Sequence, residues 1–171
     1  RFLTLDSPYK VVANIPYYLT SRLIRLLLEA EPRPAMIVLT IQKEVAERIL
    51  AQPPQMSILA LSVSAFGAPE TAAVVPRSCF SPQPSIDSAI LKISDITDAF
   101  FEKNELKPET FFRLIRAAFG QKRKMLCNTL APLMTKTACQ EVLADLGLSP
   151  KSRPQELSLD HWATLINRYE K

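Results

Sequence analysis

Glycine is rare in this chain of 171 residues, and only Gly67, Gly120 and Gly147 occur. The three lie far apart in the sequence, so they cannot form the glycine-rich loop that wraps around a phosphate or a nucleotide. This spacing excludes a complete nucleotide-type cofactor site within these residues.

Cysteine is sparse too, and Cys79, Cys127 and Cys139 stand singly, without a C-x-x-C pair. An odd number of isolated cysteines argues against a disulfide framework and against a zinc site. Asp6 and Asp87 also lack the spacing of metal ligands. We expect no bound metal and a reducing, cytoplasmic location.

Long apolar runs are missing as well. None approaches the roughly 20 residues needed to span a bilayer, and residues 1–10 lack the apolar stretch of a signal peptide. The chain is 47% hydrophobic and 22% charged, which is the composition of an ordinary globular protein. Its net charge of +4 permits a polyanionic partner without requiring one. We expect a soluble protein with no membrane partner.

The first forty residues follow a strand, helix, strand pattern. Residues 10–13 and 36–41 are apolar runs typical of short buried strands. A helix between them is expected to be capped by Thr20 or Ser21 and to end by Pro32. Such a unit implies parallel strands with helices on the faces of the sheet.

The rest of the chain changes character near Asn104, after a polar stretch. Before it we expect two helices and then two strands joined by a proline-rich connection, and after it helices alone. The expected helices are 42–50, 56–66, 111–119, 126–134, 138–146 and 159–169, and the later strands are 71–75 and 86–93. The sequence therefore predicts an α/β part over residues 1–103 and a small all-α domain over 104–171.

The segment Asn14-Ile15-Pro16-Tyr17-Tyr18 ends the first strand, where open α/β sheets bind their ligands. These residue types suit methylation of an adenine amine, whose lone pair is delocalised into the ring. The Asn14 side chain and the carbonyl of Ile15 or Pro16 can accept hydrogen bonds from the two N–H groups of the amine, while Tyr17 stacks on the extruded base. The alternative is a polar, proline and aromatic turn that only ends a strand.

Residues 80–89 place Phe80 before a stiff, proline-rich stretch that leads into a strand. Phe80 is positioned to face Tyr17 across a base. The alternative is a buried aromatic residue that anchors an extended connection.

A basic stretch over residues 107–128 contains a single acid, Glu109. Several of its cations recur at helical spacing opposite an apolar stripe, as expected of a helix that contacts an RNA backbone. A solvated helix face is the alternative. The candidate RNA-binding residues are Arg113, Arg116, Lys122, Arg123 and Lys124.

Five separated segments resemble the bacterial small-subunit ribosomal RNA adenine dimethyltransferases: residues 11–18, 42–48, 80–89, 116–124 and 154–159. The resemblance implies the C-terminal part of a Rossmann-like methyltransferase sheet over 1–103 and a helical rRNA-binding domain over 104–171. It implies S-adenosylmethionine as methyl donor and two adjacent adenines of small-subunit rRNA as targets. The expected partner is the immature small ribosomal subunit, bound by a monomer.

The same resemblance assigns roles to single residues. It implies that Asn14, Pro16 and Tyr17 are catalytic, that Asn14 also contacts the cofactor, and that Tyr17 and Phe80 sandwich the adenine. The family has a long N-terminal part with the glycine-rich cofactor loop, an acid for the ribose and an Asp for the cofactor adenine. This chain has none of these, so we expect it to bind S-adenosylmethionine weakly or not at all and to be inactive alone.

Two other functions remain open. One is methylation of large-subunit rRNA by the macrolide-resistance class, which tends to have Asn at the position of Asp87. The other is a non-catalytic RNA-binding or ribosome-assembly module, which would not need the amine-aligning residues Asn14 to Tyr17.

Overall fold

The computed structural model describes residues 8–121 and 123–169. Within them, the chain forms two compact units. The first comprises residues 8–50 and 62–97, and the second comprises residues 51–61 and 98–169. The sequence predicts the domain boundary near Asn104, whereas the two compact units of the structure divide between Thr97 and Asp98.

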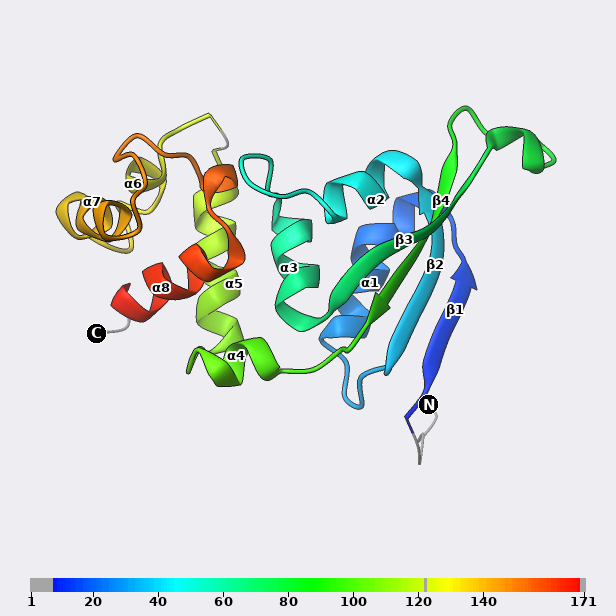
Figure 1. The fold of residues 1–171 in the computed structure, drawn as a ribbon, viewed down its shortest axis with the longest axis horizontal. Coiled ribbons are helices and arrows are strands. Elements are labelled where there is room, and N and C mark those ends of the chain that lie inside the picture. The colour runs from blue at the N-terminus through cyan, green and yellow to red at the C-terminus, as the bar shows by residue number, and fades with distance from the viewer. Residues whose placement is uncertain (1–7, 122, 170–171) are drawn as a thin grey trace. The chain divides into compact units, whose positions relative to one another are not determined.

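The first unit contains a four-stranded sheet with the order β1-β2-β4-β3 (Figure 1). Its strands are β1 (Lys10–Asn14), β2 (Met36–Gln42), β3 (Ala68–Val75) and β4 (Ser88–Ser94). The predicted parallel pairing holds for β1 and β2, whereas β4 runs antiparallel to both β2 and β3. Residues 76–87 join β3 to β4 without the α-helix that usually connects parallel strands.

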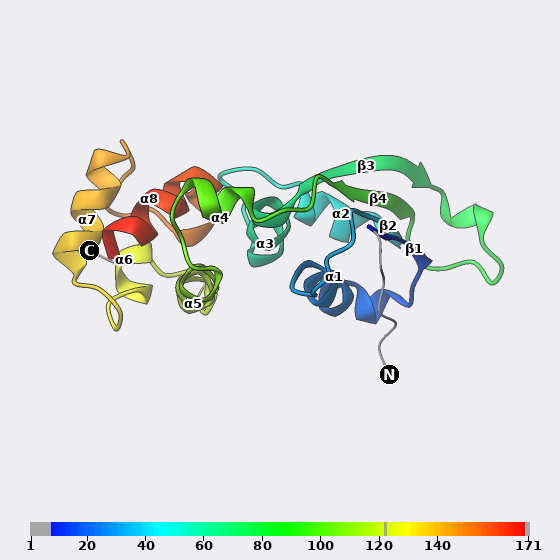
Figure 2. The ribbon, with the colours of Figure 1, turned by 90° about the horizontal axis from the view of Figure 1, so that it is seen from below.

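Helices cover one face of this sheet, and Figure 2 shows α1 on that side. Residues Ile37, Leu39 and Ile41 of β2 are buried, and they alternate with half-buried neighbours. This period of two is typical of a strand with one face in the core. The helices of this part are α1 (Thr20–Leu28), α2 (Lys43–Ile49) and the second half of α3 (Ile58–Phe66), whose residues 58–61 belong to the second unit.

The expectation that β1 is a buried strand is wrong. Val12 at its centre is 77% exposed, and exposed and half-buried residues alternate along the strand. In the part of the chain that the structure describes, β1 lies at the edge of the sheet and pairs only with β2. An apolar run reports hydrophobicity, but the burial of a strand depends on its neighbours.

The start of α1 also differs from the prediction. A single 3-10 turn, η1 (Tyr17–Leu19), leads directly into the helix, and no side chain caps it. The hydroxyl of Thr20 donates instead to the carbonyl of Tyr17, at 2.9 Å. Thr20 is 2% exposed, so this hydrogen bond satisfies a buried hydroxyl and braces the turn before the helix.

The second unit is helical apart from its connections. Its core is aromatic: Phe111 lies edge-on to Phe101 and Phe112, with ring centroids 5.5 and 5.2 Å apart. Trp162 is fully buried, and the centroid of its ring lies 6.1 Å from that of Phe119. The elements are α4 (Ala99–Lys103), α5 (Pro108–Phe119), α6 (Leu126–Thr129), α7 (Lys136–Asp145), η3 (Pro154–Glu156) and α8 (Leu159–Tyr169).

The ends of these helices follow local chemistry. Gly147 adopts φ +68° just after α7, the left-handed conformation that glycine adopts without strain. Before α8, the Ser158 hydroxyl accepts from the His161 amide and the His161 ring accepts from the Ser158 amide. His161 and Ser158 therefore cap the start of α8 together. The helix expected over 126–134 is shorter, because α6 ends at Thr129.

No helix in residues 8–121 and 123–169 combines the length and hydrophobicity needed to cross a membrane.

Candidate active site

Asn14 is the last residue of β1 and pairs with Thr40 of the parallel strand β2. It therefore lies at the carboxyl edge of the parallel strands, where open α/β sheets place their ligands. Pro16 follows with φ −57° and ψ 133°, a conformation that ends the strand and starts η1. The turn thus begins directly beyond the sheet edge.

A pocket of about 240 Å³ lies at this edge. That is smaller than the roughly 300–1,000 Å³ of pockets for drug-sized ligands, and it suits a single base. The structure brings together four predicted site residues that come from two distant segments: Asn14, Pro16, Tyr17 and Phe80. Ile15, Pro82 and Pro84 complete the lining.

Tyr17 is held at both ends. Its hydroxyl lies 2.8 Å from the hydroxyl of Ser88, which is fully buried at the start of β4. Its carbonyl accepts the hydrogen bond from Thr20 described above. Two hydrogen bonds to buried partners fix the position of the half-buried ring without covering it.

The structure distinguishes between the two backbone acceptors that the sequence left open. The Pro16 carbonyl accepts from the Leu19 amide at 3.0 Å, which closes η1. The Ile15 carbonyl accepts no hydrogen bond from any residue that the structure describes. The exposed Asn14 side chain is likewise unpaired within those residues. Asn14 and Ile15 therefore each offer an unpaired oxygen beside the pocket.

The connection from β3 to β4 carries Phe80 and is closed by its own hydrogen bonds. The Arg77 amide donates to Asp87 Oδ1 at 2.9 Å, and Arg77 Nη1 donates to the Ser85 carbonyl at 3.3 Å. The single turn η2 (Arg77–Cys79) ends with the Phe80 amide donating to the Arg77 carbonyl. These bonds hold Phe80, half-buried, in the wall of the pocket.

Sequence reasoning did not find the supporting roles of Ser88, Asp87 and Arg77. Ser88 interrupts the apolar pattern at the start of β4, and a polar residue at a core-facing position signals a required hydrogen bond. Asp87 and Arg77 flank a proline-rich connection, where a carboxylate commonly accepts from a backbone amide. Neither signal identifies the partner, because the partners are distant in sequence.

The prediction that the cations recur along a helix holds for Arg113 and Arg116 and is wrong for Arg123 and Lys124. Helix α5 ends at Phe119 with Gly120 as its C-cap, and Arg123 and Lys124 lie in the connection to α6. Arg113 and Arg116 remain on α5. The four are exposed, and Lys122 lies outside the described residues.

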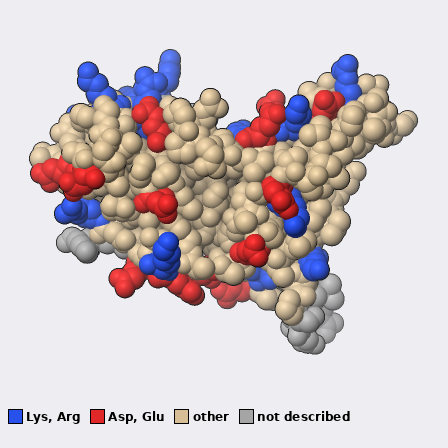
Figure 3. All heavy atoms as spheres, in the orientation of Figure 1, with Lys and Arg blue, Asp and Glu red and all other residues tan. Residues whose placement is uncertain are grey.

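The two arginines of α5 also contact aromatic rings. Arg113 donates to the Tyr169 hydroxyl at 3.3 Å and lies 5.6 Å from the centre of that ring. The Arg116 guanidinium lies 6.0 Å from the centre of the Phe112 ring. Figure 3 shows cations and acids interspersed on the face it presents, without one broad basic area.

Two ionisable groups away from the pocket are perturbed. Burial raises the pKa of the Cys139 thiol, and a hydrogen bond with Cys127 raises it further. A hydrogen bond to Glu70, at 2.7 Å, raises the pKa of the Lys92 ammonium. Across the described ranges, no group of three or more His, Cys, Asp or Glu side chains is arranged to hold a metal ion.

The family described as ribosomal RNA adenine dimethylase matches residues 3–171. A ribosomal RNA small subunit methyltransferase A from Dehalococcoides mccartyi is 41% identical over 171 residues, covering 99% of this chain and 58% of that protein. The protein of the same name from Fusobacterium nucleatum is 37% identical, covering 97% of this chain and 63% of that protein. The chain thus spans less than two thirds of the length of these curated relatives.

Two solved structures resemble this one. A dimethyladenosine transferase from Plasmodium falciparum has a TM-score of 0.76 at 28% identity, covering 95% of this chain and 67% of that chain. The 23S rRNA methyltransferase ErmE has a TM-score of 0.76 at 20% identity, covering 98% of this chain and 67% of that chain, and shows the fold alone. The predicted fold class, part of a Rossmann-like methyltransferase sheet followed by helices, is confirmed.

Proposed function

This chain belongs to the ribosomal RNA adenine dimethylase family, and we propose that it forms the target-adenine part of an enzyme that dimethylates two adjacent adenines of small-subunit rRNA. The observation that carries the proposal is the meeting of Asn14, Tyr17 and Phe80 in one pocket of about 240 Å³. The small-subunit target is supported by the printed names of the relatives.

The chemistry of an adenine amine explains the residues in the pocket. Its nitrogen is a poor nucleophile because the lone pair is delocalised into the ring. The Asn14 side-chain oxygen and the Ile15 carbonyl accept hydrogen bonds from the two N–H groups of the amine. These bonds favour a pyramidal nitrogen, whose lone pair is no longer delocalised into the ring. Tyr17 and Phe80 stack on the two faces of the extruded base. Pro16 aims the carbonyl of Ile15 by fixing the turn.

S-adenosylmethionine supplies an electrophilic methyl group when it is bound. The Asn14 amide is exposed, unpaired within the described residues and located at the ligand-binding edge of the sheet, so it fits a contact with that cofactor. Its nitrogen remains available as a donor while its oxygen accepts from the adenine. Asn14 therefore orients the amine from a position that both ligands reach.

We assign the helical part to the grip on rRNA. The cations are Arg113 and Arg116 on α5 and Arg123 and Lys124 in the following connection, with Lys122 between them in the sequence. Exposed cations on two adjoining segments suit a phosphate backbone better than one straight helix does, because they present charge in more than one direction. The partner is the immature small ribosomal subunit, bound in the cytoplasm by a monomer.

A genetic experiment tests the activity and its target. In a strain that lacks the gene, primer extension across both rRNAs should show loss of methylation at two adjacent adenines of the small-subunit rRNA alone. The wild-type gene should restore both methylations, and a gene encoding Asn14→Ala should not. Loss of a large-subunit methylation would instead identify the macrolide-resistance class. Unchanged methylation of both rRNAs would indicate a non-catalytic module.

A further inference from the structure

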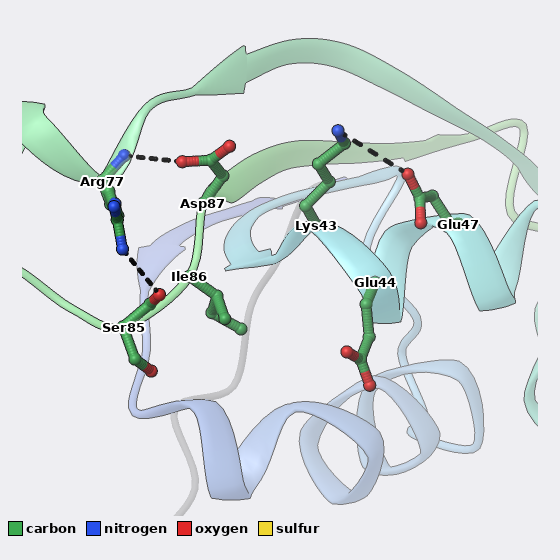
Figure 4. Close-up of a pocket in the computed structure, with 7 residues that line it drawn as sticks. All are labelled: Lys43, Glu44, Glu47, Arg77, Ser85, Ile86 and Asp87. Atoms are coloured by element: carbon green, nitrogen blue, oxygen red, sulfur yellow. Dashed lines mark hydrogen bonds and ion pairs between the residues drawn. The ribbon is translucent and has the colours of Figure 1, made fainter.

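A second and larger pocket, of about 440 Å³, lies beyond the carboxyl end of β2 (Figure 4). One side is the first turn of α2, with Lys43 and Glu44. The other side is the end of the β3–β4 connection, where Ser85, Ile86 and Asp87 lie opposite Arg77. Arg77 and Asp87 brace the connection that carries Phe80, and neither the proposed chemistry nor the proposed rRNA grip places any of these side chains against a ligand.

The two pockets share a wall. Pro84 lines the first pocket and the next residue, Ser85, lines the second. Consecutive Cα atoms are about 3.8 Å apart, so only the thickness of the chain separates the two spaces. The Lys43 amide donates to the Asp87 carbonyl at 3.1 Å, which joins α2 to this wall. The two pockets are therefore adjacent, close enough for neighbouring nucleotides of one strand to occupy both.

The second pocket offers both donors and acceptors. The Arg77 guanidinium donates one hydrogen bond, to Ser85, and its other N–H groups are unpaired among the residues described. The Glu44 carboxylate has no hydrogen-bond partner in that part of the chain, and Figure 4 shows it extending from α2 on the side away from Lys43. Lys43 lies 3.9 Å from Glu47 instead. Ile86 adds an apolar surface.

This combination fits a nucleobase better than a phosphate. The edge of a base alternates donors and acceptors, which an arginine and a carboxylate can satisfy together, and its faces are apolar. A free phosphate would meet the repulsion of Glu44 and Asp87 without a second unpaired arginine to offset it. An unstacked RNA base is also the form that proteins recognise by such edge contacts.

We propose that this second pocket binds the nucleotide next to the target adenine, with Glu44 and Arg77 contacting it from opposite sides of the pocket. The inference rests on the proposed function, because it needs an RNA strand that enters the first pocket. It gives the enzyme a second specificity determinant, one that holds the strand on the neighbouring base while the adenine is extruded. Target choice then depends on the sequence beside the adenine as well as on the shape of the RNA.

The test combines variants of the complete gene product with altered small subunits. The subunits are reconstituted with rRNA that carries one abasic position, placed in turn on either side of the two adenines. The binding of each subunit is measured for the wild-type enzyme, Glu44→Gln, Arg77→Gln and a matched control. The control is Glu29→Gln, which neutralises an exposed acid of the same unit that lines neither pocket.

We expect one abasic position to weaken wild-type binding about 10-fold, the loss of one good base contact. Glu44→Gln and Arg77→Gln should each weaken binding of the intact subunit by several fold, and the same abasic change should then cost them less than about 2-fold. Glu29→Gln should respond as the wild type does. The inference would be overturned if the losses from the variants and from the abasic positions multiplied independently at every position. It would also be overturned if no abasic position weakened binding.

Failure of the proposed function gives a different result. A wild-type enzyme that transfers no methyl group to small-subunit rRNA would contradict the function. A wild-type enzyme that methylates both adenines, but shows no coupling between Glu44 and a neighbouring base, would contradict only the second pocket.

Discussion

The hydroxyl groups of Tyr17 and Ser88 lie 2.8 Å apart, although 71 positions separate the two residues in the sequence. This hydrogen bond links the turn after β1 to the start of β4, and it fixes the Tyr17 ring in the pocket that Phe80 also lines. Ser88 does not line the pocket, so it acts through Tyr17.

Replacing Ser88 with Ala should lower kcat about 5-fold, because a net hydrogen bond contributes about 1 kcal/mol and the Tyr17 ring becomes free to tilt. Tyr17→Phe should cost a similar factor, and the double variant should cost no more than either single one. Single-turnover methylation measures all three. Ser94→Ala, at the other end of β4, should behave as the wild type. Fully additive losses would show that the Tyr17–Ser88 bond does not matter for the reaction.

Stacking on the target base should depend on Phe80 and Tyr17 but not on Tyr18. Phe80→Ala should weaken RNA-dependent turnover by roughly 5- to 150-fold, since stacking on one base contributes about 1–3 kcal/mol. Tyr18 is 84% exposed and does not line the pocket, so Tyr18→Ala is the matched control and should retain turnover within about 2-fold. The comparison is made on kcat/KM. Equal losses for Phe80 and Tyr18 would remove the reason for placing the base in this pocket.

Charge reversal in the connection after α5 should weaken subunit binding and make it less sensitive to salt. Each phosphate contact that is lost lowers the slope of log K against log salt by about 0.7–0.9. Arg123→Glu and Lys124→Glu should each show this effect, measured by filter binding over a series of salt concentrations. Lys103→Glu, on α4 of the same unit, should leave the slope unchanged. An unaltered slope in the first two variants contradicts the proposed grip.

Gly67 should be intolerant of a side chain. A Cβ atom at this position would lie 2.8 Å from the backbone oxygen of Ser94, so Gly67→Ala forces two backbone segments apart. We expect a loss of about 1–3 kcal/mol in the free energy of unfolding. Gly120→Ala is the control, since its Cβ would lie no closer than 3.4 Å to other atoms at φ −58°. Urea denaturation of both variants measures the difference.

Stability should fall in alkaline solution because of Cys139. Burial raises the pKa of this thiol above its ordinary value of 9.0, so the folded protein keeps a proton that the unfolded chain releases. The free energy of unfolding is therefore unaffected by the ionisation of this thiol below pH 9, and it decreases as the pH rises above 9. Unfolding free energies measured from pH 8 to pH 10.5 should therefore decline less steeply for Cys139→Ala than for the wild type. Replacement of the exposed Cys79 should leave the decline unchanged.

The sequence was most informative where a pattern is local. Helix α8 has the predicted bounds, because its apolar stripe and the residues that start it are adjacent in the chain. The strands β2 and β4 were found because their apolar runs alternate with turn residues. The candidate residues Asn14 and Tyr17 were found because one short segment carries both.

What could not be predicted depends on distant partners. The exposure of Val12 follows from the place of β1 at the edge of the sheet, which its own residues do not specify. The end of α5 at Phe119 was predicted, but its start at Pro108 precedes the apolar stripe that marks this helix in the sequence. The second pocket is lined by Glu44 and Arg77 from different elements, and no periodicity in the sequence connects the two.

The two free oxygens of Asn14 and Ile15 have a consequence for how the product leaves. An unmodified adenine amine brings two N–H donors to these acceptors, a monomethylated amine brings one, and a dimethylated amine brings none. Each transfer therefore removes one hydrogen bond and adds bulk at the same point, so the affinity of the pocket for the base declines as the reaction proceeds. If the proposed function holds, a finished adenine should be released because it no longer offers hydrogen bonds to the oxygens that aligned it, and the pocket is then free for its neighbour.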